Sequence, residues 1–176
     1  MKRFVIAVLL LLIALLFLWA AYLDGVVAFA DYGVKIPDGA YGVFRVVATD
    51  TDSPLYLTHG VGQSIVDRED AACIRSWGED GYAIFDHQGS EVGGGIWRVN
   101  EMAVGGSAFL FRADKPTKEY ICTAIYLANS DGYRFIADVD KRNIKPKAND
   151  IICVSCAWED DLNYVAYYKL VGELPE

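Results

Sequence analysis

The sequence lacks the short motifs by which most active sites and cofactor sites are recognised. It has no GxSxG elbow and no HExxH helix, and it contains only two histidines, His59 and His87. The segment Gly60-Val61-Gly62, before Ser64, lacks the third glycine of the dinucleotide fingerprint, and no Walker lysine follows it. We therefore predict no catalytic residue, no cofactor and no metal site from a motif.

The chain is also short of positive charge. It has 16 lysines and arginines against 24 aspartates and glutamates, a formal net charge of −8. Because Lys2 and Arg3 precede a hydrophobic run and every acid follows it, the rest of the chain carries 14 − 24 = −10. A domain this acidic repels phosphate backbones, so we expect no binding to nucleic acid. The basic segment Lys141–Lys147 is a local exception, which we interpret as a solvated loop.

Charge is absent altogether from Phe4 to Leu23, a run of 20 residues. A helix of that length spans about 30 Å, the thickness of a bilayer's hydrocarbon core. The cations before it and the acids after it predict a single transmembrane helix with the N-terminus in the cytoplasm and the domain outside, periplasmic or extracellular. Residues 1–30 are thus a membrane anchor, or a signal segment cleaved after Ala30, and residues 31–40 are a linker.

Aromatic residues are plentiful, with 11 Tyr, 8 Phe and 4 Trp, and such residues favour strands. We predict a β-rich domain over residues 41–172, with one helix from Ser64 to Trp77, where apolar residues recur at helical spacing. The expected fold is mainly β, a small antiparallel barrel or sandwich with one packed helix. Strands are predicted at Tyr41–Ala48, Leu55–Thr58, Tyr82–Phe85, Ile96–Val99, Ala108–Arg112, Glu119–Ala128, Tyr133–Asp140, Asp150–Ala157 and Tyr164–Val171.

The clearest hairpin joins Glu119–Ala128 to Tyr133–Asp140 across a turn that contains Asp131-Gly132. The Asp-Gly pair accepts the positive φ angles that a tight turn requires. One face of this hairpin is the more apolar, so we expect that face to lie against the core. Its residues are Cys122, Ala124, Tyr126, Phe135, Ala137 and Val139.

Four cysteines, Cys73, Cys122, Cys153 and Cys156, allow three interpretations. Disulfides suit an exported domain, free core thiols suit an apolar one, and the CxxC spacing of Cys153 and Cys156 is found in zinc and redox sites. This CxxC falls inside a predicted strand, where positions three apart point to opposite faces, so its sulfurs should diverge. All four are candidates for disulfide formation.

Export, strong negative charge and abundant Tyr and Trp lead us to interpret the domain as a membrane-tethered binding module. Its expected partner is a protein or envelope ligand, with a basic protein favoured by charge and an inhibitor or immunity protein as one form. The alternatives are a structural subunit of a membrane complex, or an envelope hydrolase in which Asp86 and His87 form a general-base pair.

Overall fold

A computed structural model of the chain describes residues 8–19, 33–68, 70–77, 81–87, 98–131, 134–157 and 161–174. Residues 1–33 and 34–176 form two separate units, and residues 8–19 of the first unit are helical. Within the described ranges, no helix has the length and apolar character needed to cross a membrane. The predicted membrane segment Phe4–Leu23 extends beyond the described residues, so the anchor stays a prediction.

The described residues of the second unit are built almost entirely into strands, with a single short α-helix, α2 (Gln63–Val66). Two 3-10 turns, η1 (Val47–Thr49) and η2 (Val99–Glu101), complete the regular structure described. The strands are β1 (Gly42–Val46), β2 (Thr51–Leu57), β3 (Ala72–Ser76), β4 (Gly81–Asp86), β5 (Ser107–Arg112), β6 (Lys115–Asp131), β7 (Arg134–Ala137), β8 (Asn143–Ile144), β9 (Asp150–Cys156) and β10 (Leu162–Glu173).

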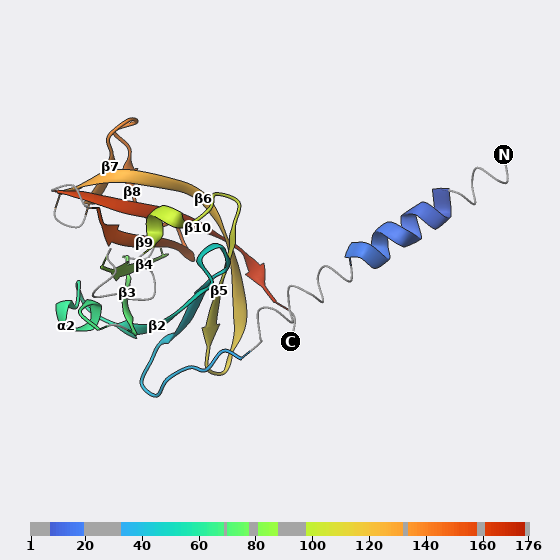
Figure 1. The fold of residues 1–176 in the computed structure, drawn as a ribbon, viewed down its shortest axis with the longest axis horizontal. Helices are drawn as coiled ribbons and strands as arrows, with labels where there is room; N and C mark the ends of the chain where they lie inside the picture. Colours follow the sequence, from blue (N-terminus) through green and yellow to red (C-terminus); the bar gives the residue numbers. More distant parts are fainter. Residues whose placement is uncertain are drawn as a thin grey trace. The chain divides into compact units, whose positions relative to one another are not determined.

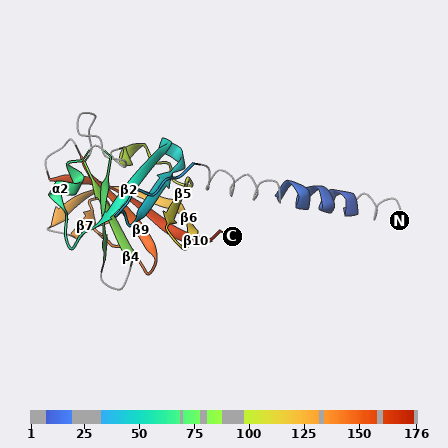
Figure 2. The same cartoon turned by 90° about the horizontal axis from the view of Figure 1, so that it is seen from below.

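Eight of these strands close into a barrel, which decides between the barrel and the sandwich expected from the sequence. The order around it is β10-β9-β4-β3-β2-β1-β5-β6, and pairing between β10 and β6 closes the ring (Figures 1 and 2). Strands β7 and β8 extend the sheet beyond β6. The pairings are antiparallel, as expected, except for two parallel ones, β2 with β3 and β4 with β9.

The barrel core is the cluster of buried side chains that point inward from all eight ring strands. At its centre, the ring of Phe44 meets the edges of Tyr120 and Tyr168, with ring centroids 6.2 and 5.5 Å away. Burial of one such aromatic side chain stabilises a fold by about 1.5–3 kcal/mol, and paired rings add to that. This core makes the barrel wall a stiff support for side chains on its outer face.

A second cluster, the hairpin cluster, lies on the outer face of β3, β4, β9 and β10. The long β6–β7 hairpin covers this face and contributes Phe135 and Ala137, while Val66 comes from α2. Alternation along the strands separates the two clusters, because in β9 Ile151 and Cys153 belong to the barrel core whereas Ile152 and Val154 belong to the hairpin cluster. Both faces of β9 are therefore buried.

The predicted helix from Ser64 to Trp77 is wrong over most of its length. Only α2 is helical, its N-cap is Gly62 rather than Ser64, and Ala72–Ser76 is strand β3. Strand β3 is buried on both faces, with Cys73 in the hairpin cluster and Ile74 in the barrel core. A short strand buried on both faces has no alternation, so its apolar residues matched a helical spacing by coincidence.

The predicted hairpin is confirmed, with Asp131 opposite Arg134 in the register of β6 and β7. The predicted face is divided between the two clusters, because Cys122 is buried in the barrel core whereas Phe135 and Ala137 are buried in the hairpin cluster. Val139 is 96% exposed because β7 ends at Ala137. The predicted strand at Ile96–Val99 lies mostly outside the described residues, and Val99 itself begins η2.

Candidate active site

The parallel pairing of β4 with β9 brings a histidine and a cysteine to the same edge of the barrel. The last residues in register are Asp86 and Ser155, so the next positions along the two strands are His87 and Cys156. Because parallel strands run in the same direction, both side chains stand at the carboxyl ends of their strands. Residues far apart in sequence thus become neighbours at one rim.

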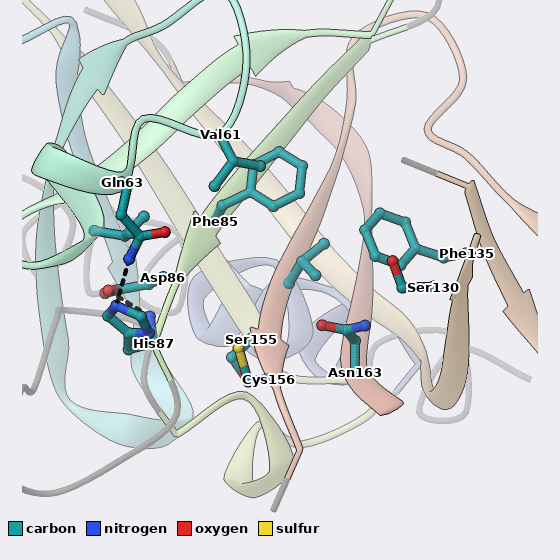
Figure 3. A pocket seen from close by; sticks show the side chains of 12 residues that line it. Val61, Gln63, Phe85, Asp86, His87, Ser130, Phe135, Ser155, Cys156 and Asn163 are labelled. Atoms are coloured by element: carbon teal, nitrogen blue, oxygen red, sulfur yellow. Dashed lines mark hydrogen bonds between the residues drawn. The ribbon is translucent and has the colours of Figure 1, made fainter. Parts of the chain in front are cut away.

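Strand β10 adds a third polar residue to this rim, because Asn163 is in antiparallel register with Cys156. Residues in register point to the same face of a sheet, so His87, Cys156 and Asn163 form one row across three adjacent strands. Figure 3 shows Cys156 between the other two. The next row inward, Phe85 and Val154 with Val165 beside them, belongs to the hairpin cluster.

This row of three borders a cavity of about 160 Å³ with a largely apolar wall. The apolar side chains come from the loop before α2, from α2 itself, from β4 and β9, and from the β6–β7 hairpin. None of the described residues that line the cavity is Arg or Lys. The lining consists of Val61, Gln63, Val66, Phe85, Asp86, His87, Ser130, Phe135, Val154, Ser155, Cys156 and Asn163.

The imidazole of His87 is held by two residues of the α2 segment. Its Nε2 lies 2.9 Å from Oδ1 of Asp67 and 3.3 Å from Nε2 of Gln63. Gln63 Nε2 also donates to Asp67 Oδ1 at 2.7 Å. The hydrogen bond from His87, and then that from Gln63, lowers the pKa of the Asp67 carboxyl, since both favour its ionised form. Asp67 is therefore a carboxylate at neutral pH.

Asp86 has a different role from the one predicted. Its Oδ1 accepts a hydrogen bond from the backbone N–H of His87 at 2.7 Å, and its side chain is 5% exposed. The carboxylate that binds the imidazole comes from Asp67, which was not singled out in the sequence. The Asp86–His87 pair thus fixes the backbone where β4 ends, while Asp67 meets the ring.

The four cysteines are free thiols in the structure, which gives no support to the predicted disulfides. Cys73, Cys122 and Cys153 are at most 1% exposed, and burial raises the pKa of each of these thiols. Cys156 alone is exposed. The predicted divergence within the CxxC is confirmed, because Cys153 points into the barrel core and Cys156 lies on the opposite face. The two sulfurs therefore do not form one metal or redox site.

The remaining candidate residues do not line the cavity. His59 is in a bend after β2 and does not line the cavity, and Gly62 starts α2 without forming a phosphate loop. Sequence reasoning named Cys156 and His87 separately but did not bring them together, and it missed Asn163 and Asp67. The usable signal was that Cys156 and His87 each come at the end of a strand.

Comparisons with known proteins identify the fold. No protein-family model and no curated protein sequence matches the chain. Among solved structures, Streptococcus pneumoniae sortase C is similar with a TM-score of 0.61 and 15% identity, over 80% of this chain and 73% of that one. Sortase C1 from Streptococcus agalactiae has a TM-score of 0.59 and 13% identity, over 84% and 75%. Listeria monocytogenes sortase A has 0.59 and 16%, over 79% and 93%.

These similarities show a sortase-like fold, and they overturn the interpretation of the domain as a binding module of the inhibitor or immunity type. The neighbours are sortases, cysteine transpeptidases of pilin and cell-wall proteins, and hence enzymes. Negative charge and abundant Tyr and Trp misled the sequence-based interpretation, because composition does not show which side chains the fold brings together at a strand end. The domain has the fold of the sortases.

Proposed function

We propose that this chain is a sortase-like cysteine transpeptidase in which Cys156 is the nucleophile and His87 the general acid and base. One observation carries the proposal. The exposed cysteine of the chain stands at the end of β9, in line with the histidine that ends β4, on the rim of a cavity. The sortase-like fold supports the same chemistry.

The chemistry proceeds in two halves through a thioester. His87 accepts the thiol proton, the sulfur of Cys156 attacks a peptide carbonyl, and His87 returns the proton to the departing amine. A second amine then attacks the thioester carbonyl, forms a new amide and regenerates the thiol. The first half breaks one amide bond and the second half forms another, so no oxidant or reductant is needed.

Asn163 is the candidate donor to the oxyanion that forms in each half. Its side-chain amide carries two N–H donors, and its register opposite Cys156 sets it beside the reacting sulfur. The described lining of the cavity offers no guanidinium or ammonium group for this role. Loss of one oxyanion donor in other enzymes costs about 10²–10³-fold in kcat, so Asn163→Ala should slow the reaction by a comparable factor.

The substrate class is a polypeptide. Streptococcus pneumoniae sortase C has been described with reference to pilin substrate specificity, and a protein substrate is the corresponding partner here. The apolar wall formed by Val61, Phe85, Phe135 and Val154 favours an apolar side chain beside the scissile bond.

The membrane anchor belongs to the same proposal, with residues 4–23 spanning the bilayer and the catalytic domain outside. Support comes from the uncharged run itself and from helical residues 8–19, whose apolar side chains are all exposed. The test fuses the C-terminus of the full chain to a reporter enzyme that works only outside the cytoplasm. We expect this reporter to be active. Inactivity of that reporter would contradict the proposed orientation.

A thioester trap tests the proposed activity. The protein is incubated with a pool of random peptides and hydroxylamine, a small amine that intercepts thioesters, and products are read by mass spectrometry. We expect peptide hydroxamates from the wild-type protein and none from Cys156→Ser or His87→Gln. Cys73→Ala and His59→Gln are matched controls, because neither residue lines the cavity, and both should retain activity. Equal product from Cys156→Ser would contradict the proposal.

A further inference from the structure

The contacts of His87 determine which of its ring nitrogens carries a hydrogen. A carboxylate only accepts hydrogen bonds, so the 2.9 Å contact between Asp67 Oδ1 and His87 Nε2 requires a hydrogen on Nε2. The amide nitrogen of Gln63 only donates, and it donates to Asp67 at 2.7 Å. Its 3.3 Å approach to Nε2 is thus a close contact between two donors that share one acceptor. In the neutral ring, Nδ1 is the basic nitrogen.

The α2 segment is well placed to hold this arrangement. Asp67 is the C-cap of α2, and its neighbour Val66 is 3% exposed in the hairpin cluster. Ile65 packs against the same cluster. The carboxylate is therefore attached to a segment whose position is fixed by burial, although the side chain of Asp67 is 52% exposed and that of His87 31%.

From these contacts we propose that Asp67 is a positioning residue for His87. It keeps the hydrogen on Nε2 and thereby leaves Nδ1 to exchange the proton with the sulfur of Cys156. Its carboxylate also lies at hydrogen-bond distance from the ring that gains a positive charge when the thiol proton is accepted. This assignment rests on the proposed function, in which Cys156 and His87 react together.

An ordinary surface ion pair is the alternative. Exposed pairs of this kind contribute little to folding stability, so the two roles are distinguished by the state of the imidazole and not by unfolding. Among the described residues, three titratable groups are placed at His87, and their roles can be separated. Asp67 comes from α2, Asp86 precedes His87 in β4 and binds its backbone, and Cys156 comes from β9.

The direct test reads the tautomer of His87 by ¹⁵N NMR at a pH where the ring is neutral. With only two histidines in the chain, His59→Gln assigns the signals. We expect the wild-type protein to have the hydrogen on Nε2, and Asp67→Asn to give a mixture of tautomers or the opposite one. Asp67→Glu should restore the wild-type pattern in part. Asp70→Asn is the matched control, since Asp70 is 75% exposed and pairs with Arg68.

A kinetic arm follows alkylation of Cys156 by iodoacetamide across pH, which needs no substrate. Asp67→Asn should lower the rate at neutral pH and change the shape of the pH–rate profile, whereas Asp70→Asn should match the wild type. In the hydroxylamine assay, we expect Asp67→Asn to lower kcat about 10- to 100-fold and to leave KM within about two-fold of the wild type. The reason is that a wrongly oriented imidazole slows the chemical step and not substrate binding.

The outcomes separate the two claims. An unchanged tautomer and an unchanged alkylation profile in Asp67→Asn would overturn the role of Asp67, even if the wild-type protein proved to be an active transpeptidase. Conversely, failure of the wild-type protein to form any thioester would overturn the proposed function, whatever the NMR spectra show.

Discussion

Cys156 should react with thiol reagents far faster than the other three cysteines. Cys73, Cys122 and Cys153 are at most 1% exposed, so a reagent reaches them only when the structure opens. An opening that costs about 5 kcal/mol, at the low end of domain stabilities, leaves about one molecule in several thousand reactive at any time. The expected ratio of rates is therefore at least about 10³, and the raised pKa values of the buried thiols increase it further.

The assay is a time course of iodoacetamide labelling, read as intact mass in native buffer and again in denaturant. We expect one adduct in native buffer and four in denaturant, with no change when a reductant is added first. Cys156→Ser should remove the fast adduct, and Cys73→Ala should not. A second native adduct at a comparable rate would refute the burial argument, and fewer than four adducts in denaturant without reductant would reveal a disulfide that the structure does not contain.

Three further predictions concern stability. Phe44→Ala should destabilise the domain by about 3–5 kcal/mol in urea unfolding, because it empties the centre of the barrel core, and a loss below about 1 kcal/mol would show that the core is loosely packed. Gly81→Ala should cost more than about 1 kcal/mol, because Gly81 has a φ of +142° and a Cβ there would come within 2.3 Å of the carbonyl oxygen of Lys147; Gly172→Ala, with open space, is the control and should stay within about 0.5 kcal/mol of the wild type. Burial raises the pKa of Tyr120 and Tyr168, and raises that of Tyr41 to about 12, so the stability these residues contribute is complete below about pH 10 and is lost as pH rises above it. For a fully buried tyrosine, the free energy of unfolding falls by about 1.4 kcal/mol per pH unit in that range. The slope of unfolding free energy against pH, measured by urea unfolding at successive pH values, should be smaller by that amount in Tyr168→Phe.

The sequence predicted the architecture because alternation and turn residues are local signals. The β6–β7 hairpin shows this well, since the Asp-Gly pair predicted a turn between two strands that do pair, and alternation predicted that Phe135 and Ala137 are buried. The same rule predicted that Cys153 and Cys156 would diverge. Where both faces of a strand are buried, as in β3, alternation disappears and the prediction failed with it.

The candidate site could not be predicted in the same way, because it depends on which strands become neighbours. Periodicity specifies a residue's face but not the partner strand, and the parallel pairing of β4 with β9 joins segments that are far apart in the sequence. Alternation could still have corrected one error. Adjacent residues in a strand point to opposite faces, so Asp86 was a poor choice as partner for the imidazole of His87.

Strand β10 both closes the barrel, through β6, and carries Asn163 beside Cys156. Assembly of the site and closure of the ring are consequently one event, and both await the last strand to be synthesised in the described domain. Pairings between segments that are distant in sequence form slowly, because the chain loses conformational entropy before the stabilising contacts are made. A chain that has not yet added β10 would therefore hold Cys156 and His87 without Asn163, the oxyanion donor proposed above. Under the proposed function, the appearance of transpeptidase activity during refolding would mark the moment at which β10 closes the barrel.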